Sequence, residues 1–156
     1  EFISIDAKDI LIKYPKTPYP KLHNLKDLDL NGCHNSLNFP SKLTQLKKLS
    51  IHDTYTEYLS EPKLIPITIP YSFLRDLCIM HTNFTVINLL QCMYLEKLFI
   101  HGCDHLKCIK LPEYNISLKD VNLLSNKYIK NYKNGNINDN EERLNIIRML
   151  RNPERP

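Results

Sequence analysis

A spacing of aliphatic residues recurs five times along the chain, in residues 25–33, 46–54, 74–82, 95–103 and 118–126. In each copy the first, fourth and sixth positions hold Leu, Ile or Val, and the ninth is Cys, Thr or Asn. The fourth positions follow one another at intervals of 21, 28, 21 and 23 residues. A self-similar period of this length is typical of stacked repeats, so the chain is predicted to fold as a solenoid.

The centre of each copy alternates apolar and polar residues, as in Leu28-Asp29-Leu30. This alternation predicts a short strand with one buried face. One such unit cannot bury its aliphatic row alone, whereas parallel stacked units build a continuous core. The ninth position needs a small group that can donate a hydrogen bond to the backbone where the chain leaves the strand. It holds Cys33, Thr54, Thr82, Cys103 and Asn126.

This pattern resembles that of the leucine-rich repeat family over residues 20–132, which we expect to be the repeat domain. The resemblance implies an α/β, mostly β, right-handed solenoid with a parallel sheet on its concave face. Gly32 and Gly102 precede two of the cysteines, which favours tight turns there. Prolines at 20, 40, 70 and 112 favour extended return segments over long helices on the convex side. The longest interval predicts a loop or bulge at residues 58–69.

The two ends of the chain depart from the repeat. Residues 1–19 are expected to hold an incomplete first repeat, with a strand at residues 2–5, and the chain is expected to be a fragment of a longer protein. In residues 133–156, Asp139 and Glu142 have the spacing of a helix cap. Leu144, Ile147 and Leu150 then fall on one face. We expect a helix that caps the last repeat, or alternatively docks a partner.

The residues that alternate with the aliphatic rows are expected on the concave face. Their first column alternates in charge: Asp27, Lys48, Asp76, Lys97 and Asp120. Neighbouring strands lie about 4.8 Å apart, so each charge would face opposite charges on both sides. This arrangement favours a stabilising ladder, and the alternative is a charge stripe that a partner reads.

The next two columns bring Cys78, Met80, Phe99 and His101 together, an apolar and imidazole patch where a solvated sheet would carry polar groups. Exposed apolar clusters mark interaction sites. The alternative is ordinary packing under a loop or terminal segment. The predicted partner-binding residues on the concave face are Ser50, His52, Cys78, Met80, Lys97, Phe99, His101 and Asn122.

Other chemical sites are weighed and disfavoured. Residues 101–108 hold two His and two Cys, but His101 would face the concave sheet and Cys103 the core, so zinc is not expected. A disulfide between Cys33 and Cys103 would have to span three strand steps, about 14 Å. Cys78 is predicted to be the most reactive cysteine, and a nucleophilic pair with His52 or His101 lacks an oxyanion pocket. We predict no enzyme activity, no metal and no cofactor.

Composition narrows the class of partner. A net charge of +4 and a pI of about 8.7 are mild for a nucleic-acid binder. Residues 127–133 interleave Lys and Tyr, which fits a solvated return segment as well as a strand that contacts single-stranded nucleic acid. No apolar run reaches the length of a membrane span. Five cysteines, an odd number, favour a reducing compartment. Two glycosylation sequons, at Asn83 and Asn115, are expected by chance in an Asn-rich chain.

We therefore predict a monomeric, cytoplasmic protein that binds a partner protein and neither nucleic acid nor membrane. The resemblance is to intracellular leucine-rich repeat proteins, which include ubiquitin-ligase substrate receptors and pathogen proteins that act in the host cytoplasm. The alternative is a structural scaffold that oligomerises through the ends of the solenoid.

Overall fold

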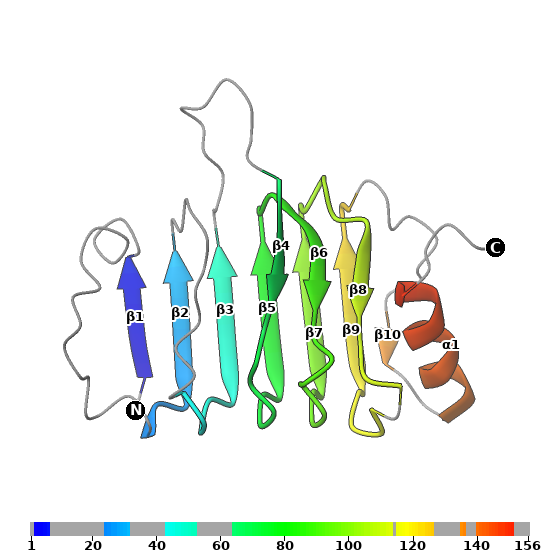
Figure 1. Ribbon diagram of the computed structural model, residues 1–156, viewed down its shortest axis with the longest axis horizontal. Helices are drawn as coiled ribbons and strands as arrows, with labels where there is room; N and C mark the ends of the chain where they lie inside the picture. Colours follow the sequence, from blue (N-terminus) through cyan, green and yellow to red (C-terminus); the bar gives the residue numbers. More distant parts are fainter. Residues whose placement is uncertain are drawn as a thin grey trace.

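The computed structural model describes residues 2–6, 24–31, 43–52, 64–113, 115–126, 135–136 and 140–151. Two sheets and one helix account for its regular structure (Figure 1). The larger sheet contains seven strands, in the order β1 (Phe2–Asp6), β2 (Asp27–Asn31), β3 (Lys48–His52), β5 (Asp76–Met80), β7 (Lys97–His101), β9 (Asp120–Leu124) and β10 (Gly135–Asn136). The smaller sheet contains β4 (Ile65–Thr68), β6 (Phe84–Asn88) and β8 (Cys108–Lys110). The helix α1 spans Asn140–Arg151.

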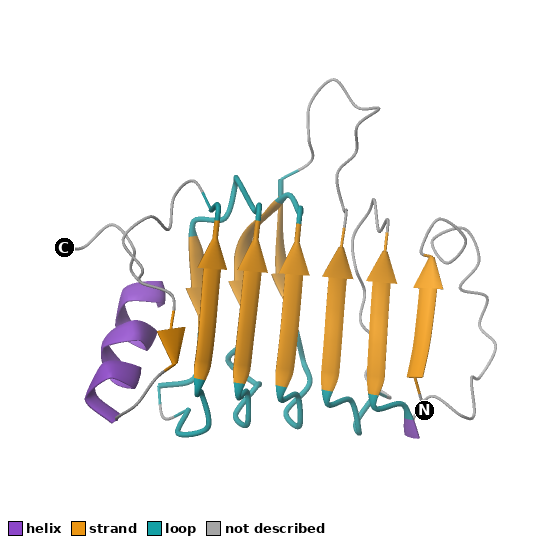
Figure 2. Cartoon of the chain, turned by 180° about the vertical axis from the view of Figure 1, so that it is seen from behind, coloured by secondary structure: helices purple, strands orange, loops and turns teal. Residues whose placement is uncertain are grey.

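The first six strands of the larger sheet are parallel and in register, which confirms the predicted repeat. Leu28 lies opposite Leu49, which lies opposite Leu77, and the same row continues to Leu98 and Val121. In three successive coils, a strand of the larger sheet is followed by a strand of the smaller one (Figure 2). The chain is therefore a solenoid built mostly of parallel β-structure. The described return segments, which include Pro70 and Pro112, are extended as predicted, whereas Pro20 and Pro40 lie outside the described residues.

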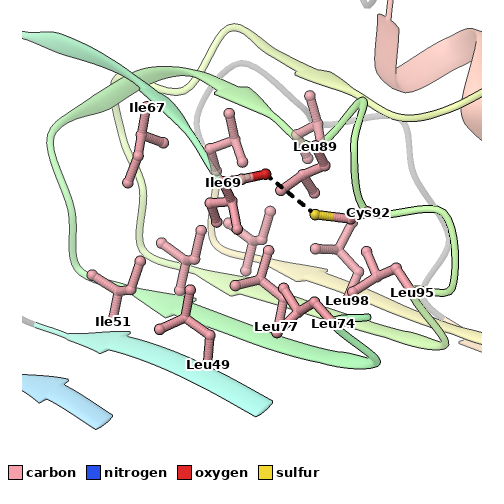
Figure 3. Close-up of a cluster of buried hydrophobic side chains, with 14 of the residues drawn as sticks. Leu49, Ile51, Ile67, Ile69, Leu74, Leu77, Leu89, Cys92, Leu95 and Leu98 are labelled. Carbon is pink, nitrogen blue, oxygen red and sulfur yellow. Dashed lines mark hydrogen bonds between the residues drawn. The ribbon is translucent and has the colours of Figure 1, made fainter. Parts of the chain in front are cut away.

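The core lies between the two sheets (Figure 3). Aliphatic side chains of the repeat, such as Leu77 and Ile79, meet Ile67 and Ile87 of the smaller sheet, and all four are at most 4% exposed. Cys92 lies at the margin of this core, where its thiol donates a hydrogen bond to the carbonyl oxygen of Ile69 at 3.5 Å. Burial of one such aliphatic side chain is worth roughly 1.5–3 kcal/mol relative to exposure, so the stack has an ample driving force.

Hydrogen bonds at the ninth repeat position support its predicted role. Asn126 donates to the carbonyl oxygen of Ile100 at 3.0 Å and accepts from the backbone N–H of Cys103 at 3.0 Å. Cys103 itself donates to the carbonyl oxygen of His101 at 3.5 Å, and its sulfur lies 3.2 Å from the hydroxyl of Thr82. The turns at Thr82, Cys103 and Asn126 are thus linked between neighbouring coils through side chains. Gly32, Cys33 and Thr54 lie outside the described residues.

The helix α1 packs beside β8 at the C-terminal end of the stack (Figure 1). Ile146, Ile147 and Leu150 are buried, and Arg143 donates to the carbonyl oxygen of Leu118 at 2.7 Å. The prediction that Leu144 shares the buried face is wrong, because it is 36% exposed. Successive residues of an α-helix are rotated by about 100° around its axis. Leu144 therefore lies about 120° around the helix from Leu150, near which the contact with β8 centres. Asp139 lies outside the described residues.

Two further expectations need correction or extension. The segment at residues 58–69 was expected to be a loop or bulge, but its last part forms β4, with a break in register between Ile65 and Pro66. The expected strand at residues 2–5 is confirmed as β1, and the rest of residues 1–19 lies outside the described residues. The stretch at 127–133 also lies outside them.

Candidate functional site

The face of the larger sheet that points away from the core is here called the open face, and Figure 2 shows it in front of the smaller sheet. Its columns have the predicted register: Asp29, Ser50, Cys78, Phe99 and Asn122 are successive partners, and so are Asn31, His52, Met80, His101 and Leu124. All eight predicted binding residues therefore lie on one continuous face.

Half-buried apolar and imidazole side chains gather on β5, β7 and β9. We call Met80, Phe99, His101 and Leu124 the open-face cluster. The rings of Phe99 and His101 meet edge to face, with centroids 6.3 Å apart and planes at 72°. Leu124 is 40% exposed. The neighbouring strands shield the sides of these side chains. Their exposed part therefore points away from the sheet, where a ligand would contact it.

The residue that follows each of these strands bends the chain out of the sheet in the left-handed conformation. Its φ is +50° at His81, +62° at Gly102 and +54° at Ser125. A Cβ on Gly102 would lie 2.6 Å from Nδ1 of His81, so the imidazole of His81 packs directly over the glycine. The rings of His81 and His101 lie 5.1 Å apart. Glycine at 102 therefore lets the imidazole of His81 pack beside that of His101 at the border of the open-face cluster. The left-handed φ of Gly102 confirms the predicted turn.

The opposite end of the open face is acidic and incompletely hydrogen-bonded. His52 Nε2 lies 3.4 Å from Asp29 Oδ1, within range for an ion pair. However, the same oxygen is buried and accepts no hydrogen bond within the described part of the chain. Asn122 Oδ1, on the far side of Phe99, is likewise buried without a hydrogen-bond partner among the described residues. Buried acceptors without a hydrogen bond are rare in native proteins.

Cys78 lies between these two ends and is half-buried, as is Cys108 on the smaller sheet. Burial raises the pKa of the Cys78 thiol, and the nearby carboxylate of Asp29 raises it further. The pKa shift opposes the predicted reactivity of Cys78, because the thiolate is the reacting form. Burial also raises the pKa of the Cys103 thiol, and that of Cys92 to about 12.

The alternating column of Asp27, Lys48, Asp76, Lys97 and Asp120 is in register as predicted. Within the described residues, however, none of its neighbours form an ion pair at 4.0 Å or less, so the opposite charges of the predicted ladder face one another in register without direct contact. Instead, Glu96 of the preceding column pairs with both Arg75 and Lys119, the latter at 3.3 Å. The two bonds lower the pKa of Glu96, with the bond from Arg75 as the larger cause.

That preceding column lies at the edge where the strands of the larger sheet begin, here called the entry edge. It contains Lys26, Lys47, Arg75, Glu96 and Lys119. On β2, β3, β5, β7 and β9 the open face holds four carboxylates, at Asp27, Asp29, Asp76 and Asp120, against two amines, at Lys48 and Lys97. The acidic excess on the open face therefore adjoins a basic excess at the entry edge, although the chain as a whole carries +4.

The sequence reasoning missed a second apolar cluster at the entry edge. It consists of Phe73, Leu90, Met93, Tyr94 and Ile116, which are 43–77% exposed. The rings of Phe73 and Tyr94 stack with centroids 6.0 Å apart and planes at 5°. Both precede the first aliphatic position of a repeat by one residue, at Leu74 and Leu95, and this shared offset was the signal that could have revealed them. We call these five residues the entry-edge cluster.

The residues weighed for other chemistry are dispersed. His101 lies on the open face, Cys103 in the core and Cys108 on β8 of the other sheet. In the part of the chain that the structure describes, no three His, Cys, Asp or Glu residues gather as metal ligands would. Asn83 and Asn115 of the two sequons are 3% and 1% exposed, so neither amide is accessible to glycosylation in the folded chain.

Comparisons with protein families, curated proteins and solved structures found no match for the chain. Among the described residues, no helix has both the length and the apolar character needed to cross a membrane. Any functional assignment therefore depends on the geometry and chemistry of the open face and its surroundings.

Proposed function

We propose that the chain is a leucine-rich repeat domain that binds a partner protein on its open face, as an interaction module and not as an enzyme. The repeat spacing supports the family, since it places aliphatic rows in the core and hydrogen-bonding side chains such as Cys103 and Asn126 at the exit of each strand. We further propose that α1 caps the last coil, with its buried Ile147 and Leu150 against the end of the core.

The observation that carries the proposal is the open-face cluster. A parallel sheet whose outer face is solvated would carry polar side chains, whereas Met80, Phe99 and His101 interrupt the polar columns on adjacent strands. Exposed apolar clusters of this kind mark interaction surfaces. The acidic excess around the cluster disfavours nucleic acid. A protein surface or segment is the ligand that fits best.

The test is affinity capture from a lysate of the parent cells, read by mass spectrometry, with the unmodified chain and two variants. Phe99→Asp introduces a charge into the open-face cluster, and Phe73→Asp makes the same change in the entry-edge cluster. We expect a partner that the unmodified chain and Phe73→Asp capture and that Phe99→Asp does not. Capture by Phe99→Asp at the level of the unmodified chain would contradict the proposal, provided that both variants give the circular dichroism spectrum of the unmodified chain.

A structural scaffold that assembles through the ends of the solenoid is the second candidate. Among the described strands, β1 is the outermost of the larger sheet and has one pairing partner, and unpaired strand edges favour association. The binding module is expected to be monomeric, with a mass that does not depend on concentration. A scaffold should give a concentration-dependent mass in light scattering and should lose it when the helix around Ile147 is disrupted. An enzyme function would instead require a catalytic activity that Cys78→Ser abolishes.

A further inference from the structure

We propose that the open face selects an extended peptide segment that carries a basic residue and, about four residues away, an apolar residue. The segment crosses the strands, with the basic side chain at Asp29 and the apolar side chain on the open-face cluster. This inference rests on the proposed function, because it specifies the chemistry of the partner that the same face binds.

The acidic end of the open face defines the basic residue. Asp29 Oδ1 is buried and accepts no hydrogen bond from the described residues, although His52 Nε2 lies 3.4 Å away. Asp27 lies on the same strand and the same face. The Asp29 side chain as a whole is 34% exposed, so a Lys or Arg side chain of the segment can reach its carboxylate and form a charge-assisted hydrogen bond, which is among the stronger polar contacts in proteins.

The apolar end defines the second residue. Phe99, His101 and Met80 are half-buried and Leu124 is 40% exposed, so together they offer an apolar top without enclosing it. A Leu, Ile, Met or Phe side chain laid on this cluster would bury apolar area on both partners, which favours binding.

The register sets the distance between the two. Asp29 and Phe99 belong to one column and are separated by three strand steps, through Ser50 and Cys78. Strand spacing makes this about 14 Å, which an extended chain covers in about four residues. The two intervening side chains are small, whereas Lys48 and His52 beside Ser50 are long. A peptide backbone can therefore approach the sheet along this column.

The experiment is selection of random twelve-residue peptides displayed on phage against the immobilised chain, with sequencing of the enriched pool. We expect enrichment of Lys or Arg about four residues from an apolar residue. Asp29→Asn, which preserves shape, should remove the preference for the basic residue, and Phe99→Ala should remove the preference for the apolar one. Asp120→Asn deletes the same charge four strand steps from Asp29 and serves as the matched control, with the enriched pattern unchanged.

One enriched peptide, made synthetically, then gives affinities by fluorescence anisotropy. Asp29→Asn should weaken binding about tenfold, and Asp120→Asn by less than about twofold. A peptide with its basic residue moved by two positions should also bind about tenfold more weakly.

The outcomes separate the two proposals. Enriched peptides that depend on Phe99 but contain no basic residue and tolerate Asp29→Asn would overturn this inference and leave the interaction module standing. Peptides that tolerate Phe99→Asp and are lost with Phe73→Asp would overturn both, because binding would then occur at the entry-edge cluster. Absence of any enrichment over the starting library would overturn the inference, since it requires a linear segment to suffice for binding.

Discussion

The open face and the entry edge both carry apolar clusters, yet the two regions present them differently. On the open face, Phe99 is held between neighbouring strands and is half-buried. At the entry edge, Phe73 and Tyr94 protrude from turns and are 53% and 50% exposed. Their charge surroundings also differ in sign, with an acidic excess around the first cluster and a basic excess around the second.

The difference shows that exposure alone does not identify the better binding surface. Side chains on the open face have fixed spacing in two directions, because register sets one and the period of the strand sets the other. A ligand that matches this spacing loses little entropy in ordering the protein. The turns of the entry edge offer more apolar area, but only the stacked pair of Phe73 and Tyr94 shows a fixed mutual geometry among the cluster's described contacts.

Two asparagines at the edges next to β9 give the largest expected stability effects, and a third, Asn122 on the open face, is their control. Asn115 accepts from the N–H groups of Ser117 and Leu118 at the entry edge, and Asn126 ties Cys103 and Ile100 at the exit. Replacement of either by Ala leaves buried backbone groups unpaired, so we expect losses of about 2–4 kcal/mol in urea unfolding.

Asn122→Ala is the control on the open face. Its Oδ1 has no described partner to lose, so the free energy of unfolding should change by less than about 0.5 kcal/mol. A loss at Asn122 as large as that at Asn126 would show that the open face is bound into the fold and not free for a ligand.

Gly102→Ala tests the rim of the open-face cluster. The left-handed φ of +62° and the 2.6 Å approach of the new Cβ to the imidazole of His81 both oppose a side chain. We expect a destabilisation of about 1–3 kcal/mol in urea unfolding. His81→Ala should relieve the steric part, so the double variant should lose less than the sum of the single ones. Strict additivity would indicate that backbone strain alone is responsible.

Asp29→Asn should change the chemistry of the open face without changing its shape. Removal of the carboxylate lowers the raised pKa of Cys78, so more thiolate is present and alkylation at pH 8 should quicken a few-fold. Peptide mapping after a timed pulse of iodoacetamide measures this, with Cys108 on the other sheet as the internal reference. Equal alkylation rates of Cys78 in both proteins would show that the Asp29 carboxylate does not affect the pKa of that thiol.

Glu96 should give the smallest effect, and it belongs to the entry edge. Arg75 and Lys119 hold its pKa below the ordinary 4.5. Its contribution to stability is therefore fully present above pH 4.5 and is lost as pH falls through the lower folded value. Glu96→Gln should reduce stability slightly at pH 7 and hardly at all at pH 2.5, as measured by urea unfolding. An equal loss at both pH values would point to packing as the cause.

The sequence alone was sufficient to predict the first six strands of the larger sheet, their register and the columns of the open face, because a fixed repeat determines which residues stack. It predicted extended return segments, but not that they pair as a second sheet. It did not predict β4, since the pattern gives no signal within the longest interval. The direct ion pairs were not predicted, because opposite charges in register need not touch: Glu96 pairs with Arg75 and Lys119, while the alternating column makes no such contact among described residues. The entry-edge cluster was missed because turn positions lie outside the strand alternation on which the prediction relied.

Site-specific photo-crosslinking tests the central claim most directly. Benzoylphenylalanine would replace Phe99 in one preparation and Phe73 in another, and each would be irradiated in a lysate of the parent cells. A crosslinked partner from position 99 and not from position 73, with the attachment site in a segment containing a basic residue, is the predicted result. A partner attached at position 73 and absent at position 99 would contradict it and assign binding to the entry edge.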